Sequence, residues 1–372
     1  MKIAVVVPGG VDASGEVRVI PALLALLGRL AVRHEVHVYA LRQQLEPGSW
    51  WLCGARVHNI GGRSGRLGQL RAIWAIAREH RVAHFDVLQS IWSGPCGTVA
   101  VVAARLLGLR CAVHLAGGEL AAVSDIGYGG CLGWRGRLRE AWVLKGANAL
   151  TAASQPMLEQ IEALGLHGQR LPLGVDLAQC PPCPPRRRQP GEALRLVQVA
   201  SLNRVKDQAC LLHALARLRE LGVDAGLDLV GEDTLGGEVQ ALADRLGLAG
   251  CVRFHGFLTQ RALWPVLASG HVHVVTSRHE AGPLSALEAA VLGVPSVGTA
   301  VGHLAEWAPH AALVVAPGDS LGLAAVLARL AGDEALRLRL AVQAQRFAIA
   351  EDADQTCLRF EHLHAELRCD GS

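Results

Sequence analysis

Two carboxylates lie in one of the most apolar segments of the chain, TSRHEAGPLSALEAAVLGVP (276–295). Glu280 and Glu288 stand eight positions apart in it, although carboxylates are rarely buried without a partner. The segment begins at the end of an expected strand, and Pro283 suits the first turn of the helix that LSALEAAVL continues. Glu280 is therefore expected just before a helix N-terminus, and Glu288 about one and a half turns inside the helix.

The start of this helix is an expected anion site. The first N–H groups of a helix have no intrahelical partner, and the helix dipole favours negative charge there. The backbone at this position comes from Gly282, Pro283, Leu284 and Ser285. A diphosphate held there, with Glu280 and Glu288 accepting hydrogen bonds from sugar and ribose hydroxyls, would be a nucleotide-sugar site. The alternative is a surface helix with two solvated glutamates, which the spacing alone favours.

The composition excludes several classes of protein. The 372 residues are 51% hydrophobic, and 36 basic and 33 acidic residues give a formal charge of +3. No long basic run indicates nucleic-acid binding. No segment has the roughly 18 uncharged apolar residues of a spanning helix, and the N-terminus does not resemble a signal peptide. We therefore expect a cytoplasmic protein, in which the ten scattered cysteines are reduced thiols.

No residues have the spacing of a metal site. Cys180 and Cys183 form a CxxC motif, but prolines flank it and no second motif follows, so a stiff linker is the preferred interpretation. Asp352 and Asp354 form an Asp-x-Asp in an expected helical tail and are interpreted as a solvated face. We expect neither a metal nor another cofactor.

Two series of alternating strands and helices predict a doubly wound α/β fold in each half of the chain. Short β-branched segments predict buried parallel strands at 2–8, 35–41, 55–61, 86–91, 110–117 and 149–154, and again at 194–201, 227–232, 252–257, 272–277, 295–299 and 312–317. Amphipathic segments predict helices at 19–32, 99–109, 207–221, 236–246, 259–268 and 283–292. Proline density interrupts the pattern at 172–192.

The expected organisation follows from this interruption. An N-terminal Rossmann-like domain covers 1–172, a proline-rich linker 173–192, a C-terminal Rossmann-like domain 193–345 and a helical tail 346–372. Ligands in such folds bind outside the carboxyl ends of the strands and between domains. Gly9 and Gly10 follow the first strand but do not complete a GxGxxG motif. They are either turn glycines or a loop whose backbone approaches a phosphate or sugar.

One block, EAGPLSALEAAVLGVPSVGTAVGHLAE (280–306), resembles the Glu-x7-Glu block of the retaining glycosyltransferases of the GT-B fold, family 4 type. Further similar segments follow the family's order: the Gly-Gly loop, TAASQ (151–155), LPLGVD (171–176), VASLNRVKDQACLLHALARL (199–218) and VRFHGFL (252–258). The resemblance spans most of the chain and is most specific over 194–318. It implies two Rossmann-like domains facing each other across a cleft, the N-terminal one for the acceptor and the C-terminal one for the nucleotide-sugar donor. It also implies a tail that crosses back to the N-terminal domain.

The resemblance implies roles for individual residues. Glu288 corresponds to the glutamate that binds the donor ribose, and Glu280 to the one near the donor sugar and its phosphates. Lys206 corresponds to the lysine that neutralises the diphosphate. His255 and Gly256 would line the base through main-chain atoms. The family transfers sugars with retention of configuration, without a protein nucleophile and without an obligatory metal.

Two positions depart from the family pattern. Where the family often has Gly-Arg-Leu before its lysine, this chain has ASL (200–202), so Arg204 is the candidate for the second cation. Where the family often has His-Gly-x-Asp, this chain has AGGE with Ala116 first and Glu119 in the acidic position. His114 lies two residues earlier on the same strand face. It is either a cleft histidine near the donor sugar or a core histidine.

The acceptor side is less specific. Basic residues gather near Tyr128 and Trp134 and earlier in the same half: Arg63, Arg66, Arg71, Arg135, Arg137, Arg139 and Lys145. They either bind an anionic lipid surface or a lipid-linked acceptor, or form a solvated face. The leading hypothesis is a cytoplasmic retaining glycosyltransferase, in peripheral contact with the inner membrane face, that acts on a glycan, lipid-linked or small-molecule acceptor. A non-catalytic GT-B subunit that binds a nucleotide sugar or a partner is the alternative, and a sugar-nucleotide epimerase on this fold is a third.

Overall fold

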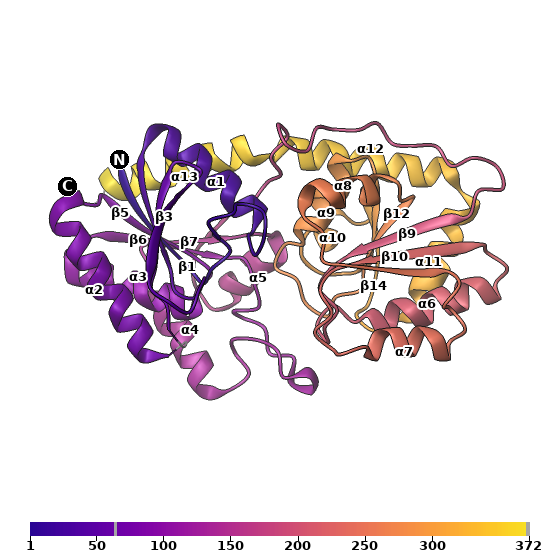
Figure 1. Cartoon of the computed structure of the whole chain (residues 1–372), viewed down its shortest axis with the longest axis horizontal. Coiled ribbons are helices and arrows are strands. Elements are labelled where there is room, and N and C mark those ends of the chain that lie inside the picture. Colours follow the sequence, from indigo (N-terminus) through magenta and orange to yellow (C-terminus); the bar gives the residue numbers. More distant parts are fainter. Residues whose placement is uncertain (63–64, 370–372) are drawn as a thin grey trace. The chain divides into compact units, whose positions relative to one another are not determined.

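The computed structural model describes residues 1–62 and 65–369, which divide into two compact units (Figure 1). The N-terminal unit comprises Met1–Gly174 and Ala353–Ser372, and the C-terminal unit comprises Val175–Asp352. Arg63 lies outside the described residues. The last helix therefore belongs to the N-terminal unit, with the boundary after Asp352 rather than after residue 345.

The N-terminal unit has an eight-stranded sheet in the order β3-β4-β2-β1-β5-β6-β7-β8. The strands are β1 (Lys2–Val7), β2 (Glu35–Ala40), β3 (Gly48–Leu52), β4 (Ala55–Asn59), β5 (Val87–Ile91), β6 (Arg110–Leu115), β7 (Ala149–Ala152) and β8 (Gln169–Arg170). All pairs are parallel except β3 with β4. The central strands are buried on both faces, which is why they are continuous β-branched runs. β3 and β8 are not among the strands that the sequence predicts.

Helices cover both faces of this sheet (Figure 1). They are α1 (Pro21–Arg33), α2 (Arg66–Ala83), α3 (Gly94–Leu107), α4 (Trp134–Gly146), α5 (Gln155–Ala163) and α13 (Ala353–Cys369), with a 3₁₀ turn at Ser124–Ile126. The connections β4–α2–β5, β5–α3–β6 and β6–α4–β7 are right-handed crossovers. They place α2, α3 and α4 side by side on one face. The crossover from β1 to β2 runs the other way, so α1 lies on the opposite face, where α13 packs against it.

The C-terminal unit has a six-stranded parallel sheet in the order β11-β10-β9-β12-β13-β14. Its strands are β9 (Leu194–Val199), β10 (Ala225–Val230), β11 (Val252–Gly256), β12 (Val272–Val275), β13 (Ser296–Thr299) and β14 (Ala312–Val315). Its helices are α6 (Gln208–Glu220), α7 (Glu238–Arg245), α8 (Gln260–Ala268), α9 (Leu284–Val291), α10 (Gly302–Trp307), α11 (Ser320–Gly332) and α12 (Glu334–Ala350). Two apolar clusters, one with α6, α7 and α11 and one with α8, α9 and α10, form the core on the two faces, and α12 contributes to both.

From Val175 onward the proline-rich segment belongs to the C-terminal unit and is packed against its helices. The N–H of Cys183 donates to the carbonyl of Val291 at 3.1 Å, and Gln345 donates to the carbonyl of Cys183 at 2.7 Å. Cys180 is fully buried, and both cysteines are free thiols. Proline stiffness and these anchors together fix the path of the segment.

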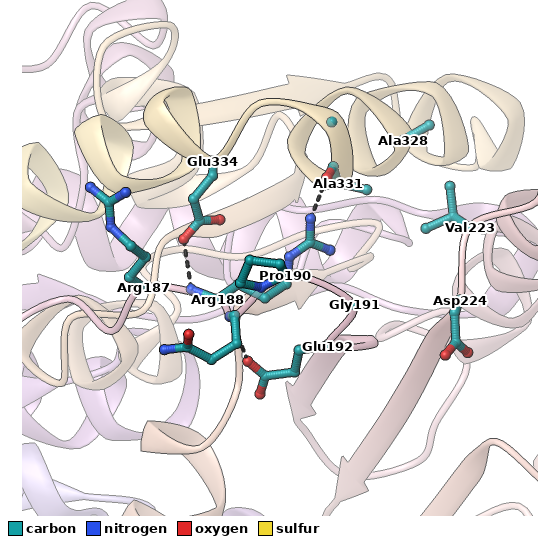
Figure 2. Close-up of a pocket in the computed structure, with 12 residues that line it drawn as sticks. Arg187, Arg188, Pro190, Gly191, Glu192, Val223, Asp224, Ala328, Ala331 and Glu334 are labelled. Carbon is teal, nitrogen blue, oxygen red and sulfur yellow. Dashed lines mark hydrogen bonds between the residues drawn. The ribbon is translucent and has the colours of Figure 1, made fainter.

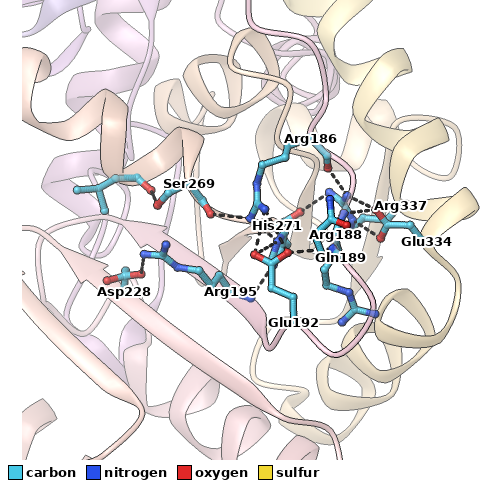
Figure 3. Close-up of polar contacts among 11 residues, drawn as sticks. Arg186, Arg188, Gln189, Glu192, Arg195, Asp228, Ser269, His271, Glu334 and Arg337 are labelled. Atoms are coloured by element: carbon cyan, nitrogen blue, oxygen red, sulfur yellow. Dashed lines mark hydrogen bonds and ion pairs between the residues drawn. The ribbon is translucent and has the colours of Figure 1, made fainter.

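A polar network holds the end of this segment (Figure 3). Arg337 of α12 is only 1% exposed and donates to the carbonyl of His271 at 3.0 Å and to that of Arg186 at 2.5 Å. Its guanidinium also forms a bidentate pair with Glu334, at 2.9 and 2.5 Å. Glu334 in turn accepts from the N–H of Arg188 at 2.8 Å. One buried cation therefore joins the segment, the strand that begins at Val272 and α12.

Arg337→Ala should destabilise the C-terminal unit. The substitution removes the donor from the carbonyls of His271 and Arg186 and leaves Glu334 without its cation, and losing one partner of a buried ion pair costs about 3–5 kcal/mol. Urea unfolding followed by circular dichroism measures it. Arg339→Ala, on the exposed side of the same helix, is the matched control and should change stability by less than about 0.5 kcal/mol. Equal unfolding midpoints for the two variants would contradict the role given to Arg337.

Candidate active site

Two loops at the carboxyl edge of the C-terminal sheet carry the main candidate residues. β12 pairs in parallel with β9, so the loops that follow these strands are neighbours. The N–H of Arg278 donates to the carbonyl of Val205 at 2.8 Å, and the hydroxyl of Thr276 donates to the carbonyl of Lys206 at 2.8 Å. The amide of Gln198, within β9, donates to the Thr276 hydroxyl at 2.9 Å. The loops are thus joined through the backbone as well as through their charged side chains.

Lys206 and Glu280, to which the family resemblance assigns separate roles, form an ion pair in the structure. Lys206 Nζ lies 2.5 Å from Glu280 Oε1, and the two side chains are 25% and 14% exposed. The Ser277 hydroxyl donates to the same carboxylate oxygen at 2.6 Å. The carboxylate is therefore held in one orientation, and the ammonium group is held beside the start of α9.

α9 begins at Leu284 with Pro283 as its N-cap. The helix therefore starts one residue later than the sequence predicted. Gly282, Pro283, Leu284 and Ser285 form the turn that leads into it. Gly302 of α10 has a φ of +48°, and a Cβ there would lie 2.7 Å from Pro283 Cδ and 3.2 Å from Gly282 Cα. A side chain at position 302 would push this turn out of place, so the glycine fixes the helix start from behind.

Glu288 lies in the same helix with its side chain almost fully buried. The amide of Gln260, at the start of α8, donates to Glu288 Oε1 at 2.6 Å. Burial raises the pKa of Glu288 to about 7, although the hydrogen bond from Gln260 opposes the shift. It is not the solvated glutamate of the alternative interpretation, because its carboxyl group is buried and accepts from Gln260.

His255 is fixed by a carboxylate rather than by solvent. Its Nε2 lies 2.7 Å from Asp228 Oδ1, and Arg195 pairs with the other oxygen at 3.1 Å. Burial would raise the pKa of Asp228, but the hydrogen bonds from His255 and Arg195 hold it below the usual range. Gly256, next in the chain, ends β11. The main-chain role expected of His255 and Gly256 stays a prediction.

Arg204, in the turn before α6, points to a carboxylate on α7. Its guanidinium pairs with Glu238 of α7 at 3.2 Å, and both side chains are about three-fifths exposed, at 61% and 59%. Exposed pairs of this kind contribute little to stability. The structure gives Arg204 a surface partner and no contact with Lys206 or Glu280 among the described hydrogen bonds and ion pairs.

His114 lies in the interior of the N-terminal unit, fully buried, which corresponds to the core alternative. Its Nδ1 lies 2.9 Å from the Thr151 hydroxyl, and Phe360 packs against its ring at 5.6 Å. Burial lowers the pKa of His114 to about 3, so the ring is neutral at physiological pH. The expectation of a cleft-facing side chain is corrected: in a strand buried on both faces, neither side points to solvent.

The packing around Gly9 and Gly10 explains why both positions are glycines. Gly10 has a φ of +81°, and a Cβ there would lie 2.6 Å from Ile20 Cδ1. A Cβ on Gly9 would lie 3.2 Å from Gln43 Oε1, the oxygen that accepts from the N–H of Val11 at 2.9 Å. The turn interpretation therefore accounts for both glycines within their own unit.

A cavity of about 490 Å³ opens at the carboxyl edge of the N-terminal sheet. Its wall includes an aromatic ring, a phenol and two buried carboxylates, from Trp92, Tyr128, Glu119 and Glu140. Arg139 holds Glu140 through two hydrogen bonds of 3.0 and 2.8 Å. Three backbone N–H groups, from residues 93, 116 and 117, donate to Glu119 at 2.7–3.3 Å, although burial still raises its pKa. Such a wall suits a ring that carries hydroxyl groups.

A second cavity, of about 680 Å³, lies at the opposite edge of the C-terminal sheet (Figure 2). Arg187, Arg188 and Glu192 line it just before β9, and Val223 and Asp224 line it just before β10. Ligands of open α/β sheets bind outside the carboxyl ends of the strands, whereas this cavity lies at the amino ends. We therefore do not include it in the candidate active site.

Residues 1–62 and 65–369 contain no group of three or more His, Cys, Asp or Glu side chains that could hold a metal ion. Asp354, of the Asp-x-Asp, pairs with Arg29 of α1. This pair joins α13 to α1 within the N-terminal unit.

The residues that orient the candidate side chains are not among those that the sequence predicts. Ser277, Gln260, Asp228 and Thr276 each hold a residue that the sequence had singled out or the loop that carries it. Ser277 and Thr276 lie close to Glu280 in the sequence, and this closeness could have identified them. Gln260 lies 28 positions before Glu288, and only the packing of α8 on α9 reveals it.

Comparison with known proteins assigns the class. The chain matches the family described as "Glycosyl transferase 4-like domain" over residues 15–174 and the one described as "Glycosyl transferases group 1" over 193–333. Sucrose-phosphate synthase of Thermosynechococcus elongatus has a similar structure, with a TM-score of 0.85 over 99% of each chain at 18% identity. HepE of Anabaena, in complex with UDP and glucose, has a TM-score of 0.75 at 19% identity, over 98% of this chain and 100% of that one.

These neighbours establish the GT-B fold, as the sequence predicted. The chain belongs to the GT-B glycosyltransferases of the family 4 type. Among curated relatives, an MMP alpha-(1->4)-mannosyltransferase of Mycolicibacterium hassiacum is 33% identical over 183 residues, 48% of this chain and 43% of that protein. A GDP-mannose-dependent phosphatidylinositol dimannoside mannosyltransferase of Mycobacterium tuberculosis is 32% identical over 179 residues, 43% of this chain and 45% of that protein. The matches span about half the length of these relatives.

The raised pKa of Glu288 predicts a pH dependence of stability. In the unfolded chain the carboxyl group ionises near 4.5, whereas in the folded chain it keeps its proton up to about pH 7. Between these values the unfolded state binds fewer protons, so stability falls as the pH rises through this window, by about 3 kcal/mol. Glu288→Gln removes this contribution. Urea unfolding at pH 5 and pH 8 should show a smaller loss for the variant than for the unmodified protein.

Glu238→Gln, a substitution of an exposed glutamate, is the control for this measurement and should keep the full pH dependence. The same loss of stability in the Glu288→Gln protein as in the unmodified one would mean that Glu288 titrates at its ordinary value.

Proposed function

We propose that the protein transfers a sugar from a nucleotide-sugar donor to an acceptor hydroxyl, with retention of configuration and without a metal ion. The observation that carries the proposal is the Lys206–Glu280 pair held at the start of α9, in the helix that also contains the buried Glu288. These residues bring a cation, a helix N-terminus and two carboxylates to one edge of one sheet. That combination matches the parts of a nucleotide sugar.

The diphosphate binds at the positively charged part of this site. Negative charge grows on the leaving nucleoside diphosphate as the glycosidic bond breaks. Glu280 already holds the ammonium group of Lys206, and the helix fixes the N–H groups at the start of α9, so little reorganisation is needed when this charge develops. Because these groups offset charge that a metal ion would otherwise neutralise, the proposal needs no metal.

The two carboxylates bind the hydroxyl groups of the donor. Glu288 accepts hydrogen bonds from the donor ribose, and Glu280 accepts from the donor sugar while Lys206 and Ser277 hold it in place. Ionised Glu288 is the better acceptor, so donor binding favours loss of its proton at neutral pH. The absence of GxGxxG and the presence of these carboxylates both favour a nucleotide sugar over a dinucleotide.

The acceptor binds in the cavity of the N-terminal unit. Trp92 and Tyr128 offer ring faces, and Glu119 and Glu140 offer hydrogen-bond acceptors to hydroxyl groups. This wall favours a sugar or polyol, free or linked to a lipid.

Two relatives support a sugar donor of this class, since one is named as GDP-mannose-dependent and HepE was crystallised with UDP and glucose. All ten cysteines are free thiols, which supports a reducing compartment such as the cytoplasm.

Lys206→Ala should lower kcat by about 10²- to 10³-fold, because it removes the cation opposite the charge of the transition state. Release of nucleoside diphosphate from UDP-, GDP- and ADP-sugars, with and without candidate acceptors, provides the assay. Arg204→Ala is the control and should leave kcat unchanged, since Arg204 pairs with Glu238 on the surface.

An unmodified protein that binds donor in a thermal-shift assay but never turns it over would support the non-catalytic alternative. A donor that raises the melting temperature of Lys206→Ala as much as that of the unmodified protein, with equal turnover, would place the diphosphate elsewhere.

The stereochemistry and the metal requirement form a separate prediction. Proton NMR of the product should show the anomeric configuration of the donor, and turnover should survive complete chelation by EDTA. Inversion would contradict the retaining mechanism while leaving donor binding intact. Loss of turnover in EDTA, restored by Mg²⁺ or Mn²⁺, would contradict the metal-free mechanism.

A further inference from the structure

Two neighbouring helices of the N-terminal unit expose apolar stripes to solvent. On α2, Leu67, Leu70 and Trp74 are 74%, 61% and 64% exposed, and their spacing places them on one side of the helix. On α4, the corresponding stripe consists of Trp134, Leu138 and Trp142 at 61%, 61% and 40% exposure. Scattered single apolar residues on a surface are common, but two aligned stripes with three tryptophans indicate a binding face.

Basic residues flank both stripes. Each helix has four: Arg66, Arg71, Arg78 and Arg81 on α2, and Arg135, Arg137, Arg139 and Lys145 on α4. The one acidic residue of each helix is turned away from solvent, because Glu79 is partly buried near Arg56 and Glu140 is buried under Arg139. In these helices, all of whose residues are described, the exposed side thus carries positive charge and no exposed carboxylate.

The tryptophans and the arginines are paired. The guanidinium groups of Arg78 and Arg135 lie 5.6 and 5.2 Å from the ring centres of Trp74 and Trp134, and that of Arg105, from α3, lies 5.0 Å from Trp142. Tryptophan rings with basic side chains beside them suit the boundary between lipid headgroups and acyl chains. α3 lies between α2 and α4 on the same side of the sheet, so the two stripes belong to one face (Figure 1).

We propose that this α2–α4 face binds the surface of a bilayer that contains anionic lipids. The apolar stripes enter the headgroup region, and the arginines and lysine contact lipid phosphates. Charge complementarity decides among the occupants: a second copy of the chain would bring the same positive face to this one, whereas an anionic bilayer offers the opposite charge. No helix in the described part of the chain is long and apolar enough to cross a membrane, so the contact is peripheral.

The same helices border the acceptor cavity. Gly65, Gly68 and Gln69, at the start of α2, and Arg139 and Glu140 of α4 line it. A bilayer on the α2–α4 face would bring a lipid-linked acceptor to the opening of that cavity. The lipid contact itself is measured without donor or turnover, so it stands or falls independently of the proposed function.

Co-sedimentation of the full chain with vesicles tests the proposal. One set of vesicles is phosphatidylcholine alone, and in the other part of it is replaced by phosphatidylglycerol. We expect binding to the anionic vesicles at least about 10-fold tighter than to the neutral ones, weakened by salt. An apolar variant combines Leu70→Gln, Trp74→Gln, Trp134→Gln and Leu138→Gln, and a basic variant combines Arg71→Gln, Arg78→Gln, Arg135→Gln and Lys145→Gln.

Each variant should bind the anionic vesicles at least about 10-fold more weakly at an unchanged melting temperature. The matched controls carry exposed substitutions elsewhere and should bind as the unmodified chain does: Trp51→Gln with Leu321→Gln, and Arg245→Gln with Arg329→Gln. No vesicle binding, equal binding to both kinds of vesicle, or equal loss in the controls would overturn the proposal. So would analytical ultracentrifugation without lipid that shows a dimer abolished by the same variants, since the face would then bind a second copy.

Discussion

The parallel pairing of β9 with β12 is the contact on which the candidate donor site depends. It makes neighbours of two loops that are 70 or more residues apart in the chain, and hydrogen bonds through Val205, Lys206 and Thr276 then lock them together. Without this pairing, the side chains of Lys206 and Glu280 would not lie close enough to form their ion pair. The central strands beneath it are buried on both faces, so a charged group within them needs a partner, as Asp228 has, whereas the loops at the strand ends can present charge to a ligand. The charge of the site follows from the architecture of the sheet.

The sequence predicted most of the fold because its strands are buried on both faces. Such strands are continuous apolar runs, and every predicted strand corresponds to an observed one. β3 and β8 were missed for different reasons: β3, GSWWL, is a partly exposed edge strand, and β8 is only two residues long. Glu280, Glu288 and Lys206 could be singled out as candidates because each lies in a short segment that resembles a segment of the family. The donors to Glu288 and His255 were not, since Gln260 and Asp228 approach them only through tertiary packing.

His114 shows the limit of reasoning from periodicity. Alternation along a strand predicts which residues share a face, but it does not predict whether that face is covered. Here α13, more than 200 positions later, covers it with Phe360, so the ring is enclosed and neutral. His273, in β12, has a similar environment: it is fully buried, bonds to Ser296 at 2.9 Å, and burial lowers its pKa to about 3. A histidine in such a sheet is therefore a core residue unless it lies at a strand end.

The assignment of α13 to the N-terminal unit makes the C-terminal unit an insertion within the N-terminal one. The C-terminal unit is a single continuous segment that contains all of its own strands, so it can fold as soon as it has left the ribosome. The N-terminal unit cannot be completed at its place in the order of synthesis, because the helix that covers His114 and packs on α1 is made after the whole C-terminal unit. During translation, His114 and the side of α1 that contacts α13 stay uncovered until α13 emerges. The unit that is synthesised first is thus the one that finishes folding last.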